Sequence, residues 1–349
     1  MKKLLLGLLI AVALSGINFA FAYELPPELA ETAPSGVPFT SDFPSGVAAI
    51  WEEAKTSVTD AFTGAVRSCA IILTVALLVG LCGVLETSGG VSNYAVLAGI
   101  LAVSLVAVGD VHNFVGLARG TLTSVKSFAD VILPALAAAA AASGSPASAA
   151  AACAVTAMFM DILITLSQGL LLPIIYAYLT AELIGAAANS AAALAAASFL
   201  KWLSTALLSL IVLAFILYLS ITGIVSSSAD AAAVRVAKTT LSTTLPVVGG
   251  IVSDAAQSVL AGALTLKNAV GVFGMLAVLA ICVTPFIHIG AHYLLYKAAA
   301  KLSGNIAGGN FAAAVNGIGG AFGLLLGTSG ACALMLFFSM LSLLSIRSI

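Results

Sequence analysis

The fold is decided by the stretch from Leu245 to Gly304, which has the sequence LPVVGGIVSDAAQSVLAGALTLKNAVGVFGMLAVLAICVTPFIHIGAHYLLYKAAAKLSG. It opens on Leu245-Pro246 and a glycine pair, continues through a polar segment, and enters a long apolar run that contains Pro285. Its polar and basic side chains include Asp254, Gln257, Lys267, Asn268, Lys297 and Lys301. A broken, charged backbone beside such an apolar run is more typical of a transporter or channel core than of a simple anchor.

The composition of the whole chain indicates a membrane protein. Of 349 residues, 61% are hydrophobic and 8% are charged, whereas soluble domains carry about 25% charged residues. We therefore predict an all-α, polytopic membrane protein with about six to eight membrane helices. The net charge of −1 and the lack of a basic block give no reason to expect a nucleic-acid partner.

One motif resembles a known family. The sequence PVVGGIVSDAAQSVLAGALTLKNAVG, followed by an apolar span and by YKAAAKL, is similar to the stage III sporulation protein AE family of endospore-forming bacteria. The resemblance implies a multi-pass protein of the mother-cell membrane around the forespore. It also implies partners in the complex between mother cell and forespore, including a separate ATPase subunit. It implies no catalytic residues and no cofactor.

The N-terminus has the three parts of a secretory signal peptide. A basic start at Lys2-Lys3 precedes an apolar run from Leu4 to Leu14 and an Ala20-Phe21-Ala22 cleavage signal. The alternative is an uncleaved first membrane helix, but the apolar run is shorter than the roughly 20 residues that a span needs. We predict cleavage of residues 1–22 and a mature N-terminus outside the cytoplasm.

The rest of the chain divides into four predicted parts. Residues 23–66 form a proline-rich arm and an amphipathic helix, and residues 67–110 form a transmembrane hairpin. Residues 111–225 and 226–349 would be two half-repeats, because several markers recur at an offset of 112 residues without a gap. These markers pair Lys126 with Lys238, Leu133-Pro134 with Leu245-Pro246, and Pro173 with Pro285.

Proline positions give the predicted helix breaks. Proline lacks a backbone donor and clashes with the preceding helical turn, so Pro134, Pro173, Pro246 and Pro285 are each expected to interrupt or kink a helix. Paired broken helices in two halves of a membrane protein often mark a substrate path. The alternative is that the Leu-Pro sites are simple helix ends at the membrane interface.

Few polar side chains are expected at membrane depth. Asp161, Thr165 and Gln168 share one helix face by their spacing. Together with Asp254, Lys267 and Asn268 they form a candidate polar path or a polar contact with another helix. A charge within a span is costly unless it is paired, protonated or hydrated.

Enzyme and metal motifs are not supported by the sequence. His288 and His292 are four residues apart but lack the intervening glutamate of HExxH and an evident third ligand, so no metal site is expected. Gly327-Thr328-Ser329-Gly330 has the GxSG form of rhomboid-like proteases, yet no histidine follows Ser329. The five cysteines are widely spaced and indicate neither a metal site nor disulfides; they are Cys69, Cys82, Cys153, Cys282 and Cys332.

Two functions remain open at this point. The first is a non-enzymatic channel, transport or scaffold core of the sporulation complex, in contact with lipid and, through its small residues, with possible further copies of itself. The alternative is an autonomous secondary transporter that uses Asp161 as a proton or cation site. Transport in liposomes without partners would distinguish the alternative from the first.

Overall fold

The computed structural model describes residues 42–84, 91–244 and 249–345, with side chains left undescribed at 53, 91–92 and 222–260. Within these ranges every regular element is a helix, which confirms the all-α prediction. The helices are α3 (Phe43–Val84), α4 (Val91–Ala142), α5 (Pro146–Leu166), the π-helical turn η1 (Ser167–Leu171), α6 (Leu172–Ala187), α7 (Ala191–Thr244), α8 (Gly249–Ala307) and α9 (Gly309–Ser345).

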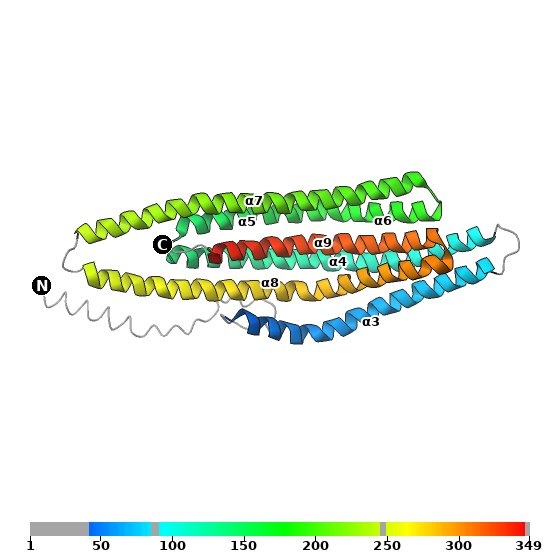
Figure 1. The fold of residues 1–349 in the computed structure, drawn as a ribbon, viewed down its shortest axis with the longest axis horizontal. Coiled ribbons are helices and arrows are strands. Elements are labelled where there is room, and N and C mark those ends of the chain that lie inside the picture. Colours follow the sequence, from blue (N-terminus) through cyan, green and yellow to red (C-terminus); the bar gives the residue numbers. More distant parts are fainter. Residues whose placement is uncertain (1–41, 85–90, 245–248, 346–349) are drawn as a thin grey trace.

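The helices run lengthwise beside one another in an elongated bundle (Figure 1). Helices α4, α8 and α9 lie in the middle, α3 follows α8 on one side, and α5–α6 and α7 lie on the other. Six segments are long and apolar enough to cross a membrane, in agreement with the predicted multi-pass architecture; they are Ala54–Val84, Asn93–Ala142, Pro146–Ala187, Ala191–Ile221, Ala261–Ala307 and Gly309–Leu344.

The longest helices are much longer than a bilayer is thick. Helix α8 has 59 residues, which span about 88 Å at a rise of 1.5 Å per residue. The hydrocarbon core measures about 30 Å, so a large part of each long helix lies outside it. The predicted boundaries after residues 66, 110 and 225 fall inside α3, α4 and α7, so the expected amphipathic segments continue directly into membrane spans.

The predicted break at Pro134 is corrected by the structure. Helix α4 continues through Pro134 and ends at Ala142. Interior prolines are tolerated in membrane helices because neighbouring helices and side chains compensate for the lost hydrogen bond. Helix α8 likewise continues through Pro285, whereas Pro246 lies outside the described residues.

The chain actually reverses at Gly144. Its φ of 95° is in the left-handed region that glycine adopts without strain. The Ser145 N–H donates to the Ala140 carbonyl at 3.2 Å, and the Gly144 N–H donates to the Ala141 carbonyl at 3.0 Å. These two bonds form a Schellman cap, and Pro146 then starts α5 at a position where its missing donor does no harm.

The helix ends do not repeat at the expected offset of 112 residues. The turn between α6 and α7, at residues 188–190, aligns at that offset with residues 300–302, which lie inside α8. The proline pair also differs in effect, because Pro173 follows a π-helical turn while Pro285 lies in a continuous α-helix. These helix ends therefore do not show the repeat that was predicted at this offset.

Glycines of α9 give room to large polar side chains from α6 and α8. The pairs in contact are Gly317 with Glu182, Gly319 with Lys297, Gly320 with Tyr178, and Gly323 with Tyr293. The Tyr178 hydroxyl donates to the Gly317 carbonyl at 3.0 Å. These small residues thus accommodate polar side chains within the chain itself.

Candidate functional site

An ion pair joins α4 to α5. The Lys126 ammonium donates to the Asp161 carboxylate, and the two side chains are 35% and 63% exposed in the isolated chain. Asp161 is therefore on the outer surface of the bundle, with a cationic partner that sequence reasoning did not assign. Their separation of 35 positions along the chain gives no local signal, because only the α4–α5 packing brings them together.

A second polar contact lies further along the same interface. The hydroxyl of Tyr176 on α6 is 3.3 Å from Nδ1 of His112 on α4. Helix α4 and the α5–α6 segment run in opposite directions, so the contacts Lys126–Asp161 and His112–Tyr176 fix their register. Halfway between the two contacts, Arg119 lies level with Gln168.

The π-helical turn explains a mismatch in this register. His112 and Lys126 are 14 residues apart on α4, whereas Asp161 and Tyr176 are 15 residues apart. A π-helical turn inserts one extra residue into a helix. The turn η1 lies between Asp161 and Tyr176, and its insertion keeps both of them facing α4.

Pro173 and the π-helical turn together leave one backbone acceptor without a main-chain donor. The α-helical donor for the Gln168 carbonyl would be the N–H of Leu172, which bonds Ser167 instead. The π-helical donor would be Pro173, which has no N–H. Such a carbonyl needs a donor from a side chain, from water or from a partner.

These residues form a polar seam on the outer face of the bundle. We define the polar seam as His112, Arg119, Thr123 and Lys126 of α4 with Asp161, Thr165, Gln168 and Tyr176 of α5, η1 and α6. The structure thus pairs the predicted Asp161 with Lys126. The register of the helices puts the predicted Thr165 and Gln168 on the same face, beside the other α4 side chains of the seam. The charges of α4 were visible in the sequence, but their direction depends on α4 being one continuous helix.

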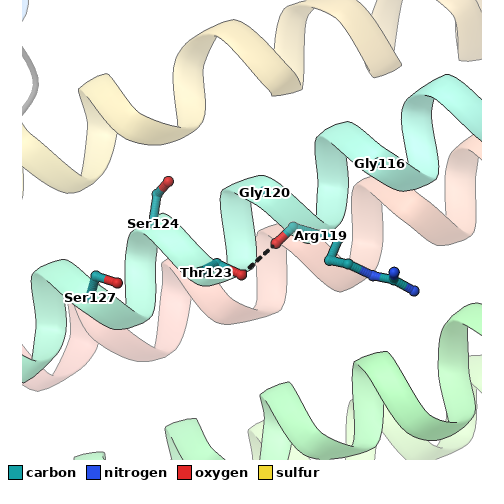
Figure 2. A pocket seen from close by; sticks show the side chains of 6 residues that line it. All are labelled: Gly116, Arg119, Gly120, Thr123, Ser124 and Ser127. Carbon is teal, nitrogen blue, oxygen red and sulfur yellow. Dashed lines mark hydrogen bonds between the residues drawn. The ribbon is translucent and has the colours of Figure 1, made fainter.

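A shallow hollow of about 560 Å³ adjoins the polar seam on α4. Figure 2 shows its lining residues, Gly116, Arg119, Gly120, Thr123, Ser124 and Ser127. The Thr123 hydroxyl donates to the Arg119 carbonyl at 3.0 Å, and the Arg119 side chain extends from the helix (Figure 2). Within the described part of the chain, no other side chain lies within 4 Å of where a Cβ would be at Gly116 or Gly120, so this face is open to close approach.

The polar seam lies level with an apolar outer surface. Phe159, two residues before Asp161, packs against Phe215 of α7 with ring centroids 5.6 Å apart. Next to Phe215, Leu213 and Leu217 are 59% and 55% exposed. Because apolar surface of this kind suits lipid, the Lys126–Asp161 pair lies at a level where lipid contact would be costly.

The other predicted polar residues lie elsewhere. Lys267 of α8 is buried, with 1% exposure, and the neighbouring Asn268 is exposed. Lys267 is close to Gly271, which contacts Leu344 near the end of α9. Asp254 belongs to the part of α8 whose side chains are outside the description. The structure therefore does not join Lys267 or Asn268 to the polar seam.

An inner polar cluster was missed by sequence reasoning. The Asp110 carboxylate accepts hydrogen bonds from Ser68 at 2.9 Å and from Tyr296 at 2.7 Å, which links α4 to α3 and α8. His292 packs near Tyr296 and against Phe114, with its Nδ1 2.9 Å from the His288 carbonyl. The hydrogen bonds to Asp110 account for its presence inside a bundle of this kind.

A model of the family "Stage III sporulation protein AE" matches residues 44–346, which is most of the chain. The chain belongs to the stage III sporulation protein AE family. It is therefore a sporulation protein with a multi-pass membrane location, as the resemblance implied.

A curated relative supports the same family. The stage III sporulation protein AE of Bacillus subtilis (strain 168) is 23% identical over 205 residues. The match covers 59% of this chain and 51% of the relative, so the chain spans about half the length of the curated relative it matches. No solved structure matches the chain.

Proposed function

We propose that this stage III sporulation protein AE family member is a non-enzymatic core subunit of the complex between mother cell and forespore. In this proposal it resides in the mother-cell membrane and works with other stage III proteins, including a separate ATPase subunit. The polar seam is the face that this core turns toward protein partners and water rather than toward lipid.

The observation that carries the proposal is that the polar seam lies at the same height along the bundle as the exposed apolar surface of α7. The seam combines an ion pair, a further arginine and a carbonyl that lacks a main-chain donor. In hydrocarbon, an unsatisfied backbone group costs several kcal/mol. Irregular backbone at membrane depth is tolerated where it is covered by protein or lines a water-filled cavity.

The autonomous transporter is supported less well. A carrier that used Asp161 as a cation site would need that carboxylate inside its own bundle, available to the ion. Here Asp161 is 63% exposed at the outside of the bundle and is paired with Lys126. A polar route that includes this residue would need further chains to enclose it.

A nitroxide spin label at the hollow tests the proposal. The label would be attached at Gly120→Cys, and at Leu213→Cys on the apolar surface of α7 as the lipid-facing control, after replacement of the exposed native Cys82. In membranes of sporulating cells, we expect lipid-dissolved oxygen to relax the label at position 213 strongly and the label at position 120 weakly. Equal oxygen access at both positions would show that the hollow faces lipid and would overturn the proposal.

Purification from the same cells tests the complex. The tagged chain should bring down other stage III proteins, and Arg119→Asp should reduce their recovery while the protein still inserts. Transport by the purified chain alone in liposomes would support the autonomous carrier instead.

A further inference from the structure

The strongest unassigned feature is a second polar surface, on α3. We define the outer stripe of α3 as its exposed, outward-facing residues Glu52, Thr56, Thr59, Asp60, Thr63 and Arg67. Glu52 pairs with Lys55 on the same helix, at 2.6 Å. Among the described side chains, no basic group lies within ion-pair distance of Asp60, and no carboxylate lies within that distance of Arg119 in the polar seam.

The unpaired charges lie at the same height along the bundle. Ser68 of α3 is level with Asp110 of α4 through their hydrogen bond, and the helices run in opposite directions. Asp60 lies eight residues before Ser68 on α3, and Ala118 lies eight residues after Asp110 on α4. Because the two helices are antiparallel, Asp60 is level with Ala118, which is next to Arg119. The contact between Val79 and Gly99 gives the same register at the other end of this helix pair.

Helix α8 supports this register independently. Gly64 of α3 adjoins His292 of α8, and Ser57 lies 3.5 Å from Thr284. One turn further along α8, the Tyr296 hydroxyl donates to the Asp110 carboxylate of α4. These contacts place the N-terminal half of α3 beside the same turns of α8 as the part of α4 that carries the polar seam.

The two charges cannot meet within one chain. Asp110 points toward α3, and Arg119 follows nine residues later, which is about two and a half helical turns. Arg119 therefore lies on the opposite face of α4 from its own α3. Copies inserted into one membrane by the same route share their orientation. Asp60 of one copy is therefore at the same height in the membrane as Arg119 of a neighbouring copy.

We propose that the polar seam and hollow of one copy receive the outer stripe of α3 from a neighbouring copy in the same membrane. Arg119 then faces the neighbour's Asp60, and Lys126 lies level with the neighbour's Glu52. The threonines of the stripe meet Gly116 and Gly120, where small residues permit close approach of the helices. The inference rests on the proposed function, since it names the protein that covers the polar seam.

The contact uses different surfaces on the two copies. Each chain offers its polar seam to one neighbour and its α3 stripe to another. Contacts of this heterologous kind repeat from copy to copy and generate rings when the rotation closes. The polar seam is incomplete without the neighbouring copy, because the carboxylate facing Arg119 comes from that copy.

Disulfide cross-linking between two differently tagged copies tests the register. One copy carries Thr59→Cys and the other carries Gly120→Cys, with Cys82 replaced in both. The control pairs Thr59→Cys with Gly109→Cys, which lies on the same face of α4 but 11 residues, or about 16 Å, away along the axis. Among the residues that the structure describes, no other side chain lies within 4 Å of where a Cβ would be at Gly109 or Gly120, so both positions accept cysteine.

We expect the Thr59–Gly120 pair to cross-link in membranes at least about tenfold more than the Thr59–Gly109 pair. Equal yields, or none with the Gly120 pair, would overturn the proposal. If a spin label at position 120 were nevertheless shielded from lipid-dissolved oxygen, a different protein would cover the hollow. The proposed function would then stand without this inference.

Charge reversal gives a second, independent test. Asp60→Arg or Arg119→Asp alone should lower the cross-linking yield about tenfold. Both changes in the same chain should restore it, because every copy then offers the reversed pair. Insertion and thermal stability in detergent are measured for all variants, and a double variant that folds but does not recover cross-linking would contradict the Asp60–Arg119 contact.

Discussion

The hydroxyl of Tyr178 occupies the space that a side chain at Gly320 would need. It is held there by its hydrogen bond to the Gly317 carbonyl. Helices α6 and α9 can therefore approach closely only because position 320 carries no Cβ. The same contact buries Tyr178 to 1% exposure and fixes α6 against the middle of the bundle.

We predict that Gly320→Ala destabilises the fold by about 1–3 kcal/mol, the usual cost of overpacking a core. The measurement is thermal unfolding in detergent. Gly304→Ala is the matched control, because its nearest neighbour would be the Ala312 Cβ at an ordinary 3.4 Å. Adding Tyr178→Phe should recover part of the loss by removing the clashing oxygen, and an unchanged melting temperature for Gly320→Ala would refute this account.

Removal of Asp161 tests the polar seam in the cell. Asp161→Leu should insert normally, since loss of a charge from a span favours insertion by about 2.5–3.5 kcal/mol. We expect it to abolish sporulation in a complementation assay, because Lys126 then has no partner in the seam. The exchange of Lys126→Asp with Asp161→Lys keeps the pair and should restore part of the activity. Normal sporulation of Asp161→Leu would show that the seam does not depend on this residue.

Ser329 should be more stable as alanine. Its side chain is 1% exposed and its Oγ has no hydrogen-bond partner within the described part of the chain. A buried hydroxyl without a partner costs about 1–3 kcal/mol, so Ser329→Ala should raise the unfolding free energy by about 1 kcal/mol and leave sporulation intact. Ser339→Ala is the opposite control, because Ser339 hydrogen-bonds Thr156 and should lose stability. If Ser329→Ala lost function without losing stability, the result would instead support Ser329 of the GxSG motif as a nucleophile.

The sequence predicted the class of fold because composition is sufficient for that purpose. Long apolar segments with few charges must become membrane helices, since no other structure satisfies their backbone in lipid. The family followed from one motif. The shared face of Asp161, Thr165 and Gln168 follows from their spacing in the sequence, and its role as a polar path stays a prediction.

The partners of that face could not be predicted, and the reason lies in the prolines. A break at Pro134 was expected from the local cost of proline, which tertiary packing overrides in α4. With a break, the direction of Arg119 and Lys126 relative to α5 is undefined. The true reversal at Gly144 depends on a Schellman cap, whose sequence signal is a single glycine within an alanine-rich run.

The π-helical turn has a consequence for how this chain can vary in length. A deletion inside a regular helix rotates everything beyond it by about 100° and moves a buried face outward. At Ser167–Leu171 the helix already holds one residue more than an α-helix would need between Asp161 and Tyr176. Loss of Gly169 should therefore convert the turn to α-helix and keep Tyr176 facing His112. The Gln168 carbonyl would still lack a main-chain donor, because Pro173 would then stand four residues after it. Orthologues one residue shorter at this point should fold into the same bundle, with the π-helical turn replaced by α-helix and the flanking helix faces unrotated.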